Sequence, residues 1–141
     1  MNRELSGSCL CGRIRYRITG DVFMAAYCHC SMCRKAHGSA FRPRALVMAE
    51  HFRWLEGEEL IADYSSSPGA HRTFCRNCGS PLIARSDAYP TIYNLALGTL
   101  DDDPGVRPAA HWHVASKASW FEIADDLPQY AEFPPIPGNS S

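Results

Sequence analysis

The chain has 141 residues, with 14 basic and 15 acidic side chains and a formal net charge of −1. This length fits one domain that can bury a core of its own. The near-zero charge argues against nucleic acid or an acidic membrane as a partner. No apolar run reaches the length of a membrane span, and the first five residues lack the apolar stretch of a signal peptide. We therefore expect a cytoplasmic protein whose cysteines stay reduced.

Short segments of strand character, separated by turn residues, predict a mostly β domain. Residues 13–18 alternate, with Ile14, Tyr16 and Ile18 on one face and three arginines on the other. This period is typical of a half-buried strand with a solvated outer face. Further strands are expected over 22–27, over 40–54 as two strands in which Pro43 marks an edge or a bend, and over 60–64, 81–85, 91–97 and 111–114.

Only one short helix is expected. Ser31 is its predicted N-cap, Met32 to His37 would form the helix, and Gly38 would end it. Residues 65–69 have the composition of a loop. We expect the domain to span residues 1–132. The remaining residues, 133–141, form a tail rich in proline, glycine and serine that is expected to be poorly ordered.

The seven cysteines fall into three groups along the chain, and an odd number fits a fully paired disulfide framework poorly. A closed zinc site takes four protein ligands. If each group stays whole, only one division gives four cysteines and three. We predict a structural zinc site of Cys9, Cys11, Cys75 and Cys78. Here Cys9 and Cys11 would face the ion from an extended segment, and Gly79 would take a positive φ after the Cys75–Cys78 turn.

The group that remains, Cys28, Cys30 and Cys33, predicts a second zinc site, so two zinc ions per chain. Three interpretations of this group are open. The fourth position can be left to water or substrate, a histidine can close it, or the thiols can be free. The candidate histidines are His29, His37, His111 and His113, although His29 should point away from the ion because it lies between two ligands. An open position would make this site catalytic.

Other residues near this group in the sequence are weaker candidates for a substrate site. Arg34 and Lys35 follow the last ligand directly and could meet an anionic group, but exposed charge on a short helix explains them as well. Trp112 and Trp120 could line a pocket, although such aromatic residues are more often part of the core.

These groups, in order, resemble the glutathione-dependent formaldehyde-activating enzyme family, which includes centromere protein V-like proteins. The matching segments are Gly7-x-Cys9-x-Cys11-Gly12, Cys28-His29-Cys30-x-x-Cys33-Arg34, Phe74-Cys75-x-x-Cys78-Gly79-Ser80, and the later run from His111 to Trp120 with Leu127-Pro128-Gln129. The resemblance implies an Mss4-like β-tent of small antiparallel sheets around zinc knuckles. It also implies the same division into a structural and a catalytic zinc site.

The resemblance further implies a carbon–sulfur lyase-type activity, the condensation of formaldehyde with glutathione to S-(hydroxymethyl)glutathione. Small-molecule thiols and aldehydes would then be its partners, and its oligomeric state is left open. A second hypothesis from another class is a non-enzymatic zinc-binding β module that binds a protein or a small ligand. A second site closed by a histidine would favour that module, and an exchangeable fourth ligand would favour the enzyme.

Overall fold

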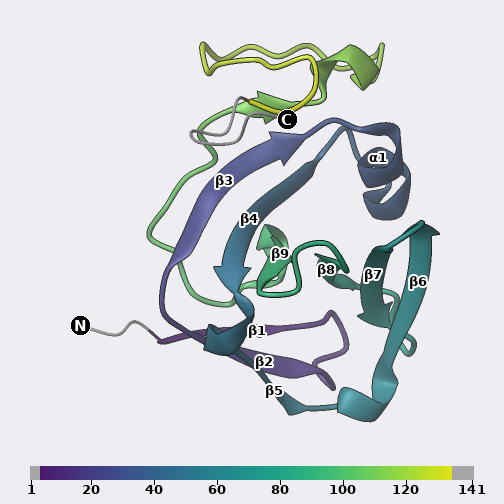
Figure 1. The fold of residues 1–141 in the computed structure, drawn as a ribbon, viewed down its shortest axis with the longest axis vertical. Helices are drawn as coiled ribbons and strands as arrows, with labels where there is room; N and C mark the ends of the chain where they lie inside the picture. The colour runs from purple at the N-terminus through teal and green to yellow at the C-terminus, as the bar shows by residue number, and fades with distance from the viewer. Residues whose placement is uncertain (1–3, 135–141) are drawn as a thin grey trace.

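The computed structural model describes residues 4–134, which form two β-sheets (Figure 1). One sheet has three strands in the order β1-β2-β5, and the other has seven in the order β10-β3-β4-β9-β8-β7-β6. All pairs are antiparallel except β10 with β3. The strands are β1 (Glu4–Ser8), β2 (Arg15–Thr19), β3 (Val22–Cys28), β4 (Arg42–Met48), β5 (Phe52–Glu56), β6 (Ile61–Ser67), β7 (Ala70–Cys75), β8 (Pro81–Ser86), β9 (Ile92–Ala96) and β10 (His111–Trp112).

Helical structure is sparse, and the mostly β prediction is confirmed. The helical elements are α1 (Ser31–His37) and the 3-10 turns η1 (Ala49–His51), η2 (Glu58–Leu60), η3 (Leu97–Thr99) and η4 (Val114–Ser116). Among the described residues, no helix has the length and apolar character needed to cross a membrane.

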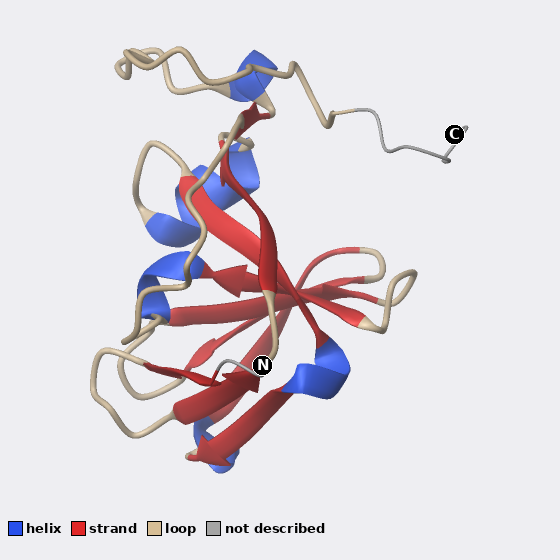
Figure 2. Ribbon diagram, turned by 90° about the vertical axis from the view of Figure 1, so that its left-hand side faces the viewer, coloured by secondary structure: helices blue, strands red, loops and turns tan. Residues whose placement is uncertain are grey.

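The long strands β3 and β4 connect two ends of the molecule (Figure 1). The three-stranded sheet lies at one end. At the other, α1 and the segment after β10 lie beyond the ends of β3 and β4. Figure 2 shows that segment almost entirely as loop, with one short helical turn. Because β10 pairs with β3 through His111 and Tyr27, it holds this segment beside the loop that carries Cys28, Cys30 and Cys33.

The core is built where the two sheets face each other. Ile14, Tyr16 and Ile18 have no exposed surface, and they belong to one cluster with Val47 of β4 and Leu95 of β9. The arginines of β2 and the residues before it are exposed on the opposite face, as the alternation predicted. Burial of such side chains stabilises a domain by about 1.5–3 kcal/mol each.

Gly7 is required by the packing of Tyr16. The two residues are partners in the β1–β2 ladder, and a Cβ on Gly7 would lie 2.1 Å from Cζ of the Tyr16 ring. That ring cannot move aside easily, because it stacks on Phe52 with centroids 5.0 Å apart and its hydroxyl meets Thr99 Oγ1 at 2.6 Å.

We therefore expect Gly7→Ala to lower the free energy of unfolding by about 2 kcal/mol, the usual effect of overpacking a core. Gly98→Ala is the matched control, because a Cβ there meets nothing within 4 Å. Urea unfolding of the three proteins measures the difference. Equal midpoints for Gly7→Ala and Gly98→Ala would contradict this account of the core.

Three sequence predictions about local structure are wrong. The N-cap of α1 is Cys30, not Ser31, and its side chain accepts a hydrogen bond from Cys33 N. β4 is an interior strand, not an edge. Pro43 is tolerated there because the β4–β9 ladder begins only at Arg44, so no N–H is needed at Pro43 on that side. Residues 65–67 belong to β6 and not to a loop.

Two glycines take the conformation that the sequence predicts. Gly38 ends α1 in the left-handed region, with φ of 59°, and Gly79 has φ of 84°. The predicted tail lies mostly outside the described residues, and the boundary at residue 132 stays a prediction.

Candidate metal centres

Four cysteine sulfurs from two distant turns come together between the sheets. The group contains Cys9, Cys11, Cys75 and Cys78, and all four sulfurs lie within 4.8 Å of one another. Cys9 Sγ lies 3.5 Å from Cys11 Sγ, which lies 3.9 Å from Cys75 Sγ. Four thiols at this separation are the donor set of a closed tetrahedral zinc site.

Backbone turns, not an extended segment, aim these sulfurs. The amide N–H of Gly12 donates to Cys9 O at 3.0 Å, which curls the chain through Cys11. On the other side, Gly79 N donates to Cys75 O at 2.7 Å. Leu10 N donates to Ser80 Oγ at 2.8 Å and links the two turns directly. The first turn leads from β1 to β2 and the second from β7 to β8, so this group fastens one sheet to the other.

The remaining three cysteines form a second group at the start of α1. The sulfurs of Cys28, Cys30 and Cys33 also lie within 4.8 Å of one another, and those of Cys28 and Cys33 are 3.4 Å apart. β3 ends at Cys28 and α1 begins after Cys30, so the turn between a strand and a helix places all three. The structure thus groups the seven cysteines in the division that counting predicted, while their metal remains a prediction.

In the second group Cys33 is favoured as the thiolate, whereas hydrogen bonds with Cys30 and Cys33, together with burial, raise the pKa of Cys28. Hydrogen bonds from Cys28 and Cys30, together with Nη2 of Arg72 at 3.6 Å from Cys33 Sγ, hold the pKa of Cys33 well below its usual range. A thiolate is the form that binds a metal ion or acts as a nucleophile. The residues present therefore fit a soft divalent ion such as zinc.

Among residues 4–134, no histidine or carboxylate joins the second group. His29 turns its ring to His111 instead, as its place between two ligands predicted. His113 packs its ring against Phe133, with centroids 4.5 Å apart. His37 is half-buried on α1, and burial lowers its pKa to about 4. Within the part of the chain that the structure describes, the three sulfurs are therefore the whole donor set of the second group.

A chain of three side chains ties the C-terminal segment to this loop. His29 Nε2 lies 2.8 Å from His111 Nδ1, and His111 Nε2 lies 3.0 Å from both oxygens of Asp125. Both rings are almost fully buried. A carboxylate only accepts hydrogen bonds, so His111 donates to Asp125 from Nε2. With a neutral His111 ring, its Nδ1 then accepts from His29 Nε2. Burial lowers the pKa of His29 to about 4, which keeps its ring neutral.

Arginines from the strands, not from α1, surround the second group. Arg42 and Arg44 are buried on β4, and Arg42 lies opposite Cys28 in the β3–β4 ladder. Arg72 comes from β7. The two cations that the sequence suggested, Arg34 and Lys35, are less buried than these arginines. Lys35 is exposed and Arg34 is half-buried. One sequence feature could have indicated the buried arginines of β4. They lie at i and i+2 in a strand that is otherwise apolar.

The two tryptophan candidates also differ. Trp112 is buried and lies under the guanidinium of Arg44, 4.3 Å from the ring centroid. Trp120 is 70% exposed, so the expectation that it belongs to the core is wrong. Its neighbour Phe121 turns inward instead and packs near Phe41 and His29.

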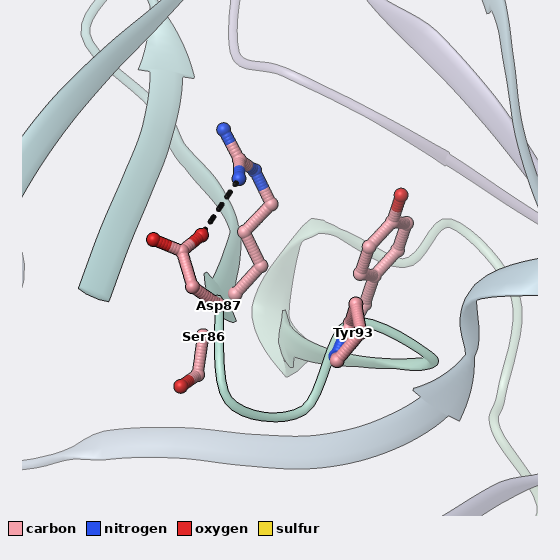
Figure 3. Close-up of a pocket in the computed structure, with 5 residues that line it drawn as sticks. Ser86, Asp87 and Tyr93 are labelled. Atoms are coloured by element: carbon pink, nitrogen blue, oxygen red, sulfur yellow. Dashed lines mark ion pairs between the residues drawn. The ribbon is translucent and has the colours of Figure 1, made fainter. Parts of the chain in front are cut away.

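A hollow lies away from both cysteine groups (Figure 3). It measures about 310 Å³ and is lined by Arg85, Ser86, Asp87, Pro90 and Tyr93. No cysteine lines it, and its cation is already paired. Arg85 lies 2.6 Å from Asp63 and 3.9 Å from Asp87. This hollow therefore offers neither a thiol nor an unpaired arginine among its lining residues.

Comparison with known proteins gives a consistent set of similarities. A sequence model described as glutathione-dependent formaldehyde-activating enzyme matches residues 4–116. A Halomonas elongata protein named "Putative glutathione-dependent formaldehyde-activating enzyme" is 31% identical over 127 residues, which cover 84% of this chain and 80% of that one. An uncharacterized lyase of Schizosaccharomyces pombe is 32% identical over 79 residues, 56% of each chain.

A solved structure is similar as well. The crystal structure of a Rhodobacter sphaeroides protein superposes with a TM-score of 0.56 at 26% sequence identity, covering 73% of this chain and 91% of that one. The similarity therefore extends from sequence to fold.

Proposed function

Because the chain belongs to the glutathione-dependent formaldehyde-activating enzyme family, we propose that it is a zinc-dependent carbon–sulfur lyase-type enzyme. Its substrate would be a thiol–aldehyde adduct such as S-(hydroxymethyl)glutathione. The observation that carries this proposal is the group of Cys28, Cys30 and Cys33, which no fourth protein ligand joins among residues 4–134. Catalytic zinc sites characteristically keep one position for water or substrate.

The reaction is an addition without oxidation or reduction. A bond forms between the thiol sulfur and the carbonyl carbon of formaldehyde, and the thiol proton ends on the new hydroxyl oxygen. Cys28, Cys30 and Cys33 would hold a zinc ion, which when bound would supply a Lewis acid that favours the thiolate form of an incoming thiol. The reverse reaction breaks the same bond and returns both substrates.

The chain's own residues would hold and orient this centre. Cys28, Cys30 and Cys33 would bind the ion, and the N–H of Arg72 at Cys33 stabilises thiolate charge. The chain from Asp125 through His111 to His29 fixes the backbone between two of the ligands. Cys9, Cys11, Cys75 and Cys78 would hold the other zinc ion, away from the reaction.

The proposal predicts that the protein accelerates exchange in a mixture of formaldehyde and glutathione, measured by NMR exchange spectroscopy. The informative variant is Cys30→Ser, because serine removes one thiolate and keeps a side chain able to cap α1. We expect two zinc ions in the native protein and one in the variant. We also expect a retained fold in the variant and an exchange rate equal to that without protein.

Three outcomes would contradict the proposal. A native protein with a single zinc ion would exclude the second metal centre. A Cys30→Ser variant with unchanged acceleration would exclude this centre as the site of chemistry. No acceleration by a native protein with two zinc ions would remove this substrate pair and favour the alternative, a non-enzymatic zinc module.

A further inference from the structure

A small hollow lies beside the second cysteine group and carries two arginines in its wall. It measures about 190 Å³, and its lining includes Arg42 of β4, Arg72 and Phe74 of β7, Ala36 of α1 and Pro81 of β8. Arg72 connects the hollow to this group, because its Nη2 lies 3.6 Å from Cys33 Sγ, although no cysteine lines the hollow itself. A space of this size corresponds to about six water molecules at ~30 Å³ each.

The arginines in this wall have N–H groups with nothing to bond to in the described part of the chain. Nε of Arg42 and both Nε and Nη1 of Arg72 are buried and have no hydrogen-bond partner. Arg42 is only 2% exposed, and its Nη2 donates to Asn94 O at 2.9 Å. Buried donors without partners are rare in native proteins and need an explanation.

The charge around this hollow is also unbalanced. Three thiolates with a divalent ion would carry one negative charge, whereas Arg42, Arg44 and Arg72 carry three positive charges. No carboxylate of residues 4–134 forms an ion pair with any of the three. Each of the three keeps at least one buried N–H without a hydrogen-bond partner in the described residues. Arg44 also lies over the face of Trp112, which Arg42 and Arg72 do not.

The hollow at the other end of β8 shows the contrasting arrangement. There Arg85 is half-exposed and makes ion pairs with Asp63 and Asp87. The dashed line in Figure 3 marks the ion pair to Asp87. The charge of Arg85 is thus balanced by carboxylates of the protein, whereas Arg42 and Arg72 have no such partner among the described residues.

We propose that the hollow lined by Arg42 and Arg72 binds the carboxylate of a small organic acid. The planar guanidinium suits a carboxylate, and the walls formed by Ala36, Phe74 and Pro81 suit a short hydrocarbon stem. A ligand with a thiol a few atoms from its carboxylate could occupy the hollow and reach the second metal centre. This last step rests on the proposed function, while carboxylate binding itself does not.

The test uses the zinc-loaded protein and calorimetric titration in a chloride-only buffer. Propionate probes the carboxylate site alone. The pair 3-mercaptopropionate and 2-mercaptoethanol shares the thiol and its two carbons and differs in the carboxylate. We expect saturable binding of propionate, and about tenfold or tighter binding of 3-mercaptopropionate than of 2-mercaptoethanol, as befits a charge-assisted contact.

Arg72→Gln should weaken propionate about tenfold or more and bring the two thiols to nearly equal affinity. Arg85→Gln is the matched control, since it removes the same charge from the wall of the other hollow, and it should change neither value. If Arg72→Gln does not fold, the affinities of the native protein for 3-mercaptopropionate and 2-mercaptoethanol still test whether the carboxylate contributes to binding.

Equal affinity of the native protein for the two thiols would overturn the inference. So would a preference that survives Arg72→Gln, or an Arg72→Gln variant that loses zinc while its affinity for propionate stays unchanged. Propionate binding by a protein that does not accelerate adduct exchange would support the carboxylate site and remove the proposed function, so the two failures are distinguishable.

Discussion

Replacement of Cys75 by serine is expected to abolish cooperative thermal unfolding, because the domain should no longer fold at ordinary temperature. Cys75 has no exposed surface and belongs to the group of four cysteines. A structural zinc site contributes about 10–16 kcal/mol in small zinc domains. The whole stability of a domain is about 5–15 kcal/mol. The free energy lost with this site would therefore exceed the stability that the core can supply.

The position of the site explains why the effect should be global. Cys11 and Cys75 are 64 residues apart in sequence, and they belong to turns of different sheets. The proposed ion between them would close a long loop and hold the two halves of the core together. Without it, the packing of Tyr16 and Ile18 against β4 depends on hydrophobic contact alone.

The control is Cys30→Ser, which removes a ligand from the other group. Cys28, Cys30 and Cys33 belong to one short segment, so their ion closes only a small loop and should not decide the fold. Circular dichroism against temperature, with zinc counted in the same samples, measures both variants. A Cys75→Ser protein that unfolds at the same temperature as the native protein would show that the four-cysteine site is not structural.

The grouping of cysteines could be predicted because each group is local in sequence. The spacing within Cys75–Cys78 or Cys28–Cys33 is set by one turn, and counting then leaves one division. Cys9 and Cys11 lie in a turn and not in the extended segment that the sequence predicted. Two sulfurs so close in sequence can converge from a turn as well as from an extended segment. Local patterns likewise predicted β2 and the end of α1 at Gly38.

The surroundings of the second group could not be predicted because they depend on pairing between distant segments. Arg42 meets Cys28 only through the β3–β4 ladder. Arg72 lies on β7, a strand that the sequence did not reveal because His71-Arg72-Thr73-Phe74 lacks apolar alternation. Nearness in sequence pointed to Arg34 and Lys35 instead.

The C-terminal segment gives a second example of the same limit. His111 was a candidate ligand because it is a histidine in a chain with an incomplete thiol site. A parallel pairing of β10 with β3 brings it to His29, 82 residues earlier. Its role is then to donate and accept hydrogen bonds, and no local pattern distinguishes that role from metal binding.

The second large effect is expected for His111→Phe. The change leaves both ring nitrogens of His29 without a partner in the interior, since His29 Nδ1 already has none. An unsatisfied buried polar group costs about 1–3 kcal/mol, so we expect the free energy of unfolding to fall by about 3 kcal/mol. Asp125 has a side chain 43% exposed and can bond to water instead.

We also expect His111→Phe to lower the zinc affinity of the group of Cys28, Cys30 and Cys33. His29 lies between Cys28 and Cys30, so a shift of its backbone moves two of the three sulfurs. Loss of a side chain that orients metal ligands typically lowers affinity about 10- to 100-fold. In a titration with a zinc chelator, the second ion of His111→Phe should therefore leave at a chelator concentration at least about tenfold lower, while the first ion is retained.

The double variant His29→Phe with His111→Phe separates hydrogen bonding from packing. Tyr27, Phe41 and Phe121 already surround the two imidazoles with aromatic rings. Replacing both partners of a buried hydrogen bond by apolar groups of similar shape can be nearly neutral. We therefore expect the double variant to be more stable than His111→Phe alone in urea unfolding. If the double variant is no more stable than His111→Phe alone, the imidazole rings act through their packing, and the hydrogen bond between them does not hold the three-cysteine loop in place.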